Sequence, residues 1–135
     1  MGRWVGFGIL LVMIKSMLLV GLGSFFGGAL RYLVSTLTGA ACGTAFPWGT
    51  LAVNLLGCTF LGVVLGLFAR FNASLSPWCL FFSVGFCGGF TTFSTFANES
   101  LRMLQGGNVV MFLLYVALSS LFGVLLLAVG YYVVK

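Results

Sequence analysis

Four long apolar stretches, separated by short segments rich in glycine, proline and polar residues, set the pattern of the chain. The apolar stretches cover about residues 17–37, 48–69, 78–104 and 109–134. About 20 apolar residues are enough for a helix to cross the roughly 30 Å hydrocarbon core of a bilayer. The separating segments carry turn signals such as Pro47, Pro77 and the Gly106-Gly107 pair. The pattern predicts an all-α membrane protein with four transmembrane helices per chain.

Charge is scarce along the whole sequence. Only 5% of the 135 residues are charged, whereas 61% are hydrophobic, and a soluble domain has about 25% charged residues. Six basic residues and one acid cannot cover the surface of so small a protein against water. Histidine is absent and Glu99 is the only acidic residue. This excludes a carboxylate pair, a Ser-His-Asp triad and a calcium cage within one chain, so we expect no enzyme.

The cysteines and the basic residues point to no further chemistry. No Cys-x-x-Cys spacing occurs among Cys42, Cys58, Cys79 and Cys87. That arrangement disfavours zinc or redox chemistry and favours small apolar packing residues. The basic residues are scattered, which predicts no nucleic-acid patch.

The N-terminal residues 1–16 differ from the rest, and we treat them as an extension of a single transmembrane domain over residues 17–135. The segment has Arg3, an apolar run over residues 4–14, and then Lys15. It resembles a signal peptide without a small-residue cleavage site, and it either extends the first helix or lies at the membrane interface. Basic residues divide four against two between the two predicted sides, a weak bias under the positive-inside rule. Either an orientation preference is encoded elsewhere or the chain inserts both ways, which would allow an antiparallel homodimer.

Small and polar residues recur at helical spacing within the apolar stretches. In the second stretch every fourth residue belongs to one stripe, formed by Thr50, Asn54, Cys58, Gly62 and Gly66. Small residues at this spacing favour close helix packing. Asn54 needs hydrogen-bond partners in hydrocarbon, so it makes an interhelical bond or belongs to a pathway. Tyr115 and Ser119 share a face of the fourth stretch, where they would line a wet groove with Asn54. Arg31 must snorkel, pair or face a vestibule.

The third stretch is the least regular. Gly88 and Gly89 disfavour a regular helix and β-branched threonines follow at once, so we predict a helix break around residues 88–92, near mid-membrane. Irregular backbone at that depth exposes carbonyls that suit a cation and amides that suit an anion. Phe93 and Phe96 are three residues apart and share a helical face. Such a pair either packs in the core or turns its electropositive ring edges toward an anion.

Three motifs resemble the Fluc (CrcB) family of fluoride channels. They are the third-stretch sequence over residues 85–99, Gly-Gly-Ala-Leu-Arg-Tyr over residues 27–32, and Pro-Trp-Gly-Thr-Leu-Ala-Val-Asn-Leu-Leu-Gly over residues 47–57. The resemblance covers residue 17 to the C-terminus. It implies a dual-topology homodimer with two antiparallel pores, which exports fluoride passively across the bacterial inner membrane.

The resemblance also assigns roles to single residues. The implied ion pathway consists of Asn54, Phe93, Phe96, Ser94, Thr95, Tyr115 and Ser119. Arg31 and Glu99 match charged positions near the pore entrances. Gly88 and Thr91 match the residues whose backbone carbonyls hold a structural sodium ion at the dimer interface, which is not transported.

Two other functions compete with a channel. A proton-coupled exporter of the small multidrug resistance type needs a membrane-embedded carboxylate, for which Glu99 is the only candidate. A non-transporting membrane assembly protein would use its small-residue stripes for packing alone.

Overall fold

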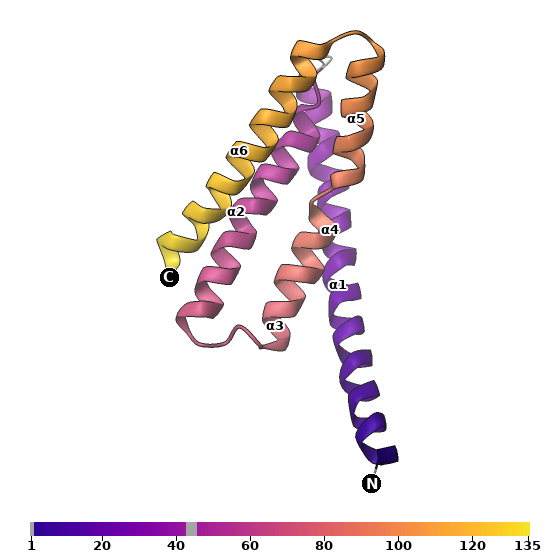
Figure 1. Ribbon diagram of the computed structural model, residues 1–135, viewed down its shortest axis with the longest axis vertical. Coiled ribbons are helices and arrows are strands. Elements are labelled where there is room, and N and C mark those ends of the chain that lie inside the picture. The colour runs from indigo at the N-terminus through magenta and orange to yellow at the C-terminus, as the bar shows by residue number, and fades with distance from the viewer. Residues whose placement is uncertain (1, 43–45) are drawn as a thin grey trace.

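The computed structural model describes residues 2–42 and 46–135, with the backbone alone for residues 2–7, 41 and 42. All regular elements in these residues are helices (Figure 1). The first, second and fourth apolar stretches form α1 (Gly2–Cys42), α2 (Trp48–Arg70) and α6 (Val109–Val134). The third is divided into α3 (Pro77–Leu80), the π-helix η1 (Phe81–Cys87), α4 (Gly88–Phe90) and α5 (Phe93–Gln105).

Four helical segments of the described chain are long and apolar enough to cross a membrane, over Gly8–Ala40, Trp48–Arg70, Pro77–Gln105 and Val109–Val134. This confirms the prediction of four membrane-spanning helices. Local chemistry explains some of the boundaries. Ser76 accepts a hydrogen bond from the amide of Trp78, and Pro77 occupies the first helical position, where its missing N–H has no cost.

Glycines bring the helices together in two pairs. Gly23 and Gly27 of α1 lie against the backbone of the third segment, where a Cβ at either position would overlap main-chain atoms. Gly62 and Gly66 of α2 lie in the same way against the backbone of α6. The predicted packing role of these two residues is therefore confirmed, because only a missing side chain lets the helix axes come so close.

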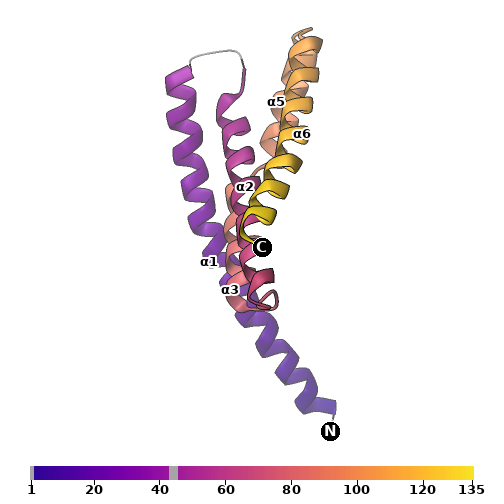
Figure 2. The same cartoon turned by 90° about the vertical axis from the view of Figure 1, so that its left-hand side faces the viewer.

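Helix α1 extends well beyond the bundle. Its 41 residues correspond to about 60 Å of helix, whereas the hydrocarbon core is about 30 Å thick. Residues 2–16 continue the helix rather than forming a separate element. Figure 2 shows this part of α1 passing the α2–α3 turn and projecting beyond it.

Two residues interrupt the third segment. Thr91 and Thr92 have extended backbone between α4 and α5, while Gly88 and Gly89, which we expected to favour irregular backbone, are helical. Thr92 caps α5 by accepting a hydrogen bond from the amide of Thr95. The π-helix that precedes α4 was not predicted.

The described side chains leave much apolar surface uncovered. A small core cluster consists of Leu51, Met103 and Tyr115, with Phe96 among the residues packed against it. Large apolar side chains elsewhere are exposed, for example Phe25 at 69% and Leu121 at 69%. Such a surface suits lipid as the solvent.

Candidate functional site

Asn54 of α2 is bonded to the backbone of the interrupted segment. Its Oδ1 accepts a hydrogen bond from the amide of Thr92 at 2.8 Å, and its Nδ2 donates to the carbonyl of the same residue at 3.2 Å. Both backbone groups of Thr92 are thereby satisfied by one side chain, which buried backbone in an apolar medium requires. The predicted interhelical hydrogen bond of Asn54 is confirmed, and one of its amide hydrogens is left over.

This bond changes the pairing of the preceding helical turn. In a continuous helix the amide of Thr92 would donate to the carbonyl of Gly88, four residues earlier. It donates to Asn54 instead, so the Gly88 carbonyl loses its regular partner. The amide and the hydroxyl of Thr91 both donate to the Cys87 carbonyl at 2.9 Å. Gly88 is exposed, and open space lies where its side chain would be.

A first cavity, which we call the inner cavity, lies beside this interruption. Its volume is about 390 Å³. Asn54, Phe93, Phe96 and Ser119 line it together with Gly88, Thr91 and Thr92. None of its lining residues is charged. Phe93 is 80% exposed, and its ring centroid lies 5.9 Å from that of Phe96.

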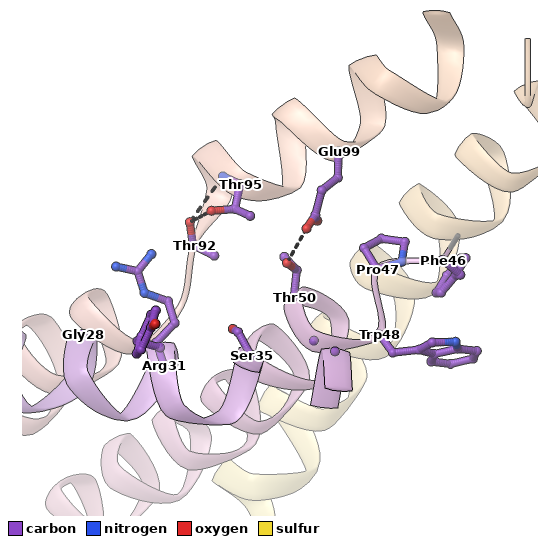
Figure 3. Close-up of a pocket in the computed structure, with 13 residues that line it drawn as sticks. Gly28, Arg31, Ser35, Phe46, Pro47, Trp48, Thr50, Thr92, Thr95 and Glu99 are labelled. Atoms are coloured by element: carbon purple, nitrogen blue, oxygen red, sulfur yellow. Dashed lines mark hydrogen bonds between the residues drawn. The ribbon is translucent and has the colours of Figure 1, made fainter. Parts of the chain in front are cut away.

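A second cavity, the outer cavity, has a volume of about 520 Å³ and contains both predicted vestibule charges, Arg31 and Glu99. Figure 3 shows Arg31 rising from α1 near Thr92, and Glu99 reaching from α5 toward Thr50. Thr95 lines this cavity as well. Thr92 lines both cavities, so the two adjoin at the interruption of the third segment.

The Glu99 carboxylate is bonded at both oxygens. Thr50 donates to its Oε1 at 2.8 Å, and the Tyr115 hydroxyl donates to its Oε2 at 2.7 Å. These are charge-assisted hydrogen bonds from two other helices, α2 and α6, which lower the cost of a carboxylate among apolar helices. The single hydroxyl proton of Tyr115 is therefore directed at Glu99.

The predicted pathway residues fall into three groups. Asn54, Phe93, Phe96 and Ser119 meet at the inner cavity, and Thr95 faces the outer one. The hydroxyl of Ser119 is buried and has no hydrogen-bond partner among the described residues. Ser94 is exposed and Tyr115 is fully buried, and neither lines these two cavities.

The structural roles of two residues of the site were not predicted from the sequence. Thr92 joins the cavities and caps α5, and its position before Phe-Ser-Thr is a capping signal that the sequence does contain. Thr50 was recognised only as a small residue of the α2 stripe. Its bond to Glu99 joins positions 49 residues apart, and no local pattern indicates such a pair.

A membrane-embedded helical bundle with a charged outer cavity adjoining an uncharged polar and aromatic inner cavity has the parts of a permeation path. Comparison with known proteins identifies the family. Residues 18–131 match the family described as CrcB-like protein, Camphor Resistance (CrcB), and the chain belongs to this family.

Similar proteins include three named fluoride-specific ion channel FluC. The one from Leptospira interrogans is 41% identical over 121 residues, which cover 90% of this chain and 95% of the relative. The one from Phocaeicola vulgatus is 44% identical over 116 residues, 86% of this chain and 95% of the relative. The one from Rhizobium etli is 46% identical over 102 residues, 75% of this chain and 81% of the relative. These relatives are named as channels, in agreement with the prediction that the chain is not an enzyme.

Proposed function

We propose that this protein is a fluoride-selective channel that exports fluoride passively across the bacterial inner membrane and so lowers cytoplasmic fluoride. The observation that carries the proposal is the inner cavity, where Phe93, Phe96, Asn54 and Ser119 meet without any charged side chain. The names of the relatives support fluoride as the permeating ion.

The lining of the inner cavity suits a small, strongly hydrated anion. Asn54 has one N–H left after bonding Thr92, and the Ser119 hydroxyl is unpartnered among the described residues. The rings of Phe93 and Phe96 are tilted by 41° to each other, and a ring edge is electropositive. Together these groups replace part of the water around fluoride. No charged side chain lines the inner cavity to hold the ion there, so it can leave.

The route runs from the outer to the inner cavity. Arg31 raises the local concentration of anions in the outer cavity. Thr95 and Thr92 follow at the junction, and Phe96 begins the aromatic part of the path. Because Tyr115 and Thr50 donate to Glu99, they reach fluoride only when the Glu99 carboxylate turns away from them.

The working unit of this proposal is an antiparallel, dual-topology homodimer with two pores. The third segment has an apolar face that a second copy can cover. Its side chains include Phe93, which is 80% exposed, and Val84, which is 54% exposed. Thr91 and Thr92 lie about midway between Pro77 and Gln105, which supports an interruption near mid-membrane. The weak charge bias between the two sides is compatible with insertion both ways.

A structural sodium ion belongs to the same proposal. Sodium binds neutral oxygen ligands, and Gly88 supplies a carbonyl that has lost its helical partner, at a residue with open space where a side chain would be. Thr91 is the first extended residue after α4, so its carbonyl also leaves the helical pattern. The two residues therefore fit such an ion, with matching carbonyls from the second copy. When bound, it adds positive potential near the pores.

Fluoride efflux from liposomes tests the function directly. Purified protein is reconstituted into vesicles loaded with potassium fluoride or potassium chloride, a potassium ionophore lets the cation leave with the anion, and efflux is followed with ion-selective electrodes. We expect fluoride to leave and chloride to stay. Phe96→Ile should lower fluoride efflux at least tenfold, whereas Phe25→Ile, on the exposed surface of α1, should not change it. Equal efflux of both anions, or none from correctly folded protein, contradicts the proposal.

The two competing functions receive less support. Proton-coupled export needs a carboxylate that meets the substrate, but Glu99 lies outside the inner cavity with both oxygens bonded. A pure assembly protein does not require polar and aromatic side chains to meet at a cavity. Proton release on addition of a hydrophobic cation would favour the exporter.

A further inference from the structure

The extension of α1 forms one wall of a groove that is separate from the proposed pathway. The groove lies between residues 12–19 of α1 and the segment that follows α2, and its volume is about 610 Å³. Val12, Lys15 and Ser16 contribute to its lining, and all three precede residue 18, where the match to the family begins. This part of the groove is therefore outside the residues that match the family.

The groove is apolar over most of its lining and has a few polar side chains. Lys15, Ser16 and Ser74 supply an ammonium group and two hydroxyls, while Leu19, Leu65, Leu80 and Val84 supply apolar surface. No hydrogen bond or ion pair of Lys15 or of the Ser16 and Ser74 side chains occurs within the described part of the chain. Leu75, in the turn, is fully exposed. The lining therefore offers donors for an anionic group beside a surface for a hydrocarbon chain.

Charge at this end of the molecule has one sign. Lys15 lines the groove together with Ser74 and Leu75 of the α2–α3 turn. Arg70 and Lys135 lie at the C-terminal ends of α2 and α6, and these two helix ends are on the same side of the bundle (Figure 1). Arg70 donates to the carbonyl of Val134 at 3.3 Å, so it is tied to the bundle. The only acid of the chain, Glu99, lies in the outer cavity toward the opposite end. Among its described lining residues, an anion at the groove therefore meets one charged side chain, the Lys15 ammonium, and no acidic side chain.

The apolar side chains of the extension need lipid or protein around them. Residues 4–14 contain no polar side chain, and Ile9, Val12 and Met13 are more than half exposed. A helix that is apolar on all sides is stable only in lipid or protein. Lys15 and Ser16 separate this run from the membrane-crossing stretch that begins at residue 17, and a basic residue at the end of a membrane-crossing stretch favours the headgroup layer.

From these observations we propose that the groove binds one anionic phospholipid. The phosphate meets Lys15, Ser16 and Ser74, and an acyl chain lies along Leu19 and Leu80. The site is independent of ion conduction, and it gives the N-terminal extension a role in selecting the lipid beside the channel.

Native mass spectrometry of the full-length protein in detergent tests the proposal. Phosphatidylglycerol and phosphatidylcholine with identical acyl chains are added in equal amounts, and the lipid retained per chain is counted. We expect preferential retention of phosphatidylglycerol. Lys15→Gln should reduce that preference about fivefold, which corresponds to about 1 kcal/mol for one basic residue near an anionic headgroup. Arg102→Gln, at the opposite end, serves as the matched control and should retain the wild-type preference.

A chain that begins at Met17 provides the second variant. It should lose the preference as well, while keeping wild-type fluoride efflux, which separates the lipid site from the proposed pathway. Equal retention of the two lipids by the wild-type protein, or an unchanged preference in both variants, overturns the proposal. If a second copy occupies the groove instead, the shortened chain dissociates into monomers and Lys15→Gln leaves lipid retention unchanged.

Discussion

Replacing Asn54 by leucine removes the side chain that satisfies both backbone groups of Thr92. The amide and the carbonyl of Thr92 lose bonds of 2.8 and 3.2 Å, and Thr92 is only 8% exposed, so water cannot easily replace them. An unsatisfied buried backbone group costs about 1–3 kcal/mol, while hydrogen bonds inside membrane proteins average about 0.6 kcal/mol. For two bonds we expect a loss of about 2 kcal/mol, roughly a 30-fold change in the folding equilibrium.

Equilibrium unfolding in mixed micelles, followed by circular dichroism, measures this loss. Thr59→Val is the matched control on the same helix, because its hydroxyl donates only to the carbonyl of Leu55, one turn earlier. It should change the unfolding free energy by less than about 0.5 kcal/mol. If Asn54→Leu costs no more than Thr59→Val, the reasoning about the interruption is refuted.

Three further predictions concern other parts of the molecule. Phe96→Ile should leave the unfolding free energy within about 1.5 kcal/mol of wild type, as similar-sized apolar exchanges do, yet lower fluoride efflux at least tenfold; retained efflux would return this ring to packing alone. Gly27→Ala should destabilise by about 1–3 kcal/mol in the same unfolding assay, because its Cβ would overlap the Phe86 carbonyl, whereas Gly21→Ala meets open space and should be neutral. Exhaustive removal of sodium should reduce fluoride efflux; full efflux in its absence would remove the role assigned to the Gly88 carbonyl.

The course of the helices was largely predictable from the sequence. Hydrophobicity over about 20 residues and turn signals such as Pro47 and Pro77 determine where a segment can cross a membrane. The fourth predicted stretch coincides with α6, and the second differs from α2 by one residue. The glycines of α2 pack as their spacing indicated, because close helix approach depends on side-chain size alone.

The interruption of the third segment was less accessible to sequence reasoning. The glycine pair suggested irregular backbone, but Gly88 and Gly89 are helical and the extended residues are Thr91 and Thr92. The reason is Asn54, which is 38 residues away in the chain and bonds the Thr92 backbone. A partner at that separation is determined by tertiary packing, which overrides local propensity.

Some features of the candidate site could be predicted from the sequence and others could not. Asn54, Phe93, Phe96 and Ser119, which the resemblance assigned to the ion pathway, line the inner cavity together. Tyr115 was predicted to line the pathway, but it lines neither of the two cavities, and its hydroxyl donates to Glu99. Sequence alone does not indicate that bond, because it depends on how α5 and α6 face each other.

The reversal potential of the reconstituted protein in a planar bilayer tests the central claim most directly. Fluoride and chloride are present at different concentrations on the two sides, and the voltage at which the current is zero is recorded. For a fluoride-selective channel this voltage changes by about 59 mV for each tenfold change in the fluoride concentration ratio. We predict that this dependence holds while changes in chloride have no effect. A reversal potential that follows chloride as well as fluoride, or that follows the cation gradient, would contradict the account.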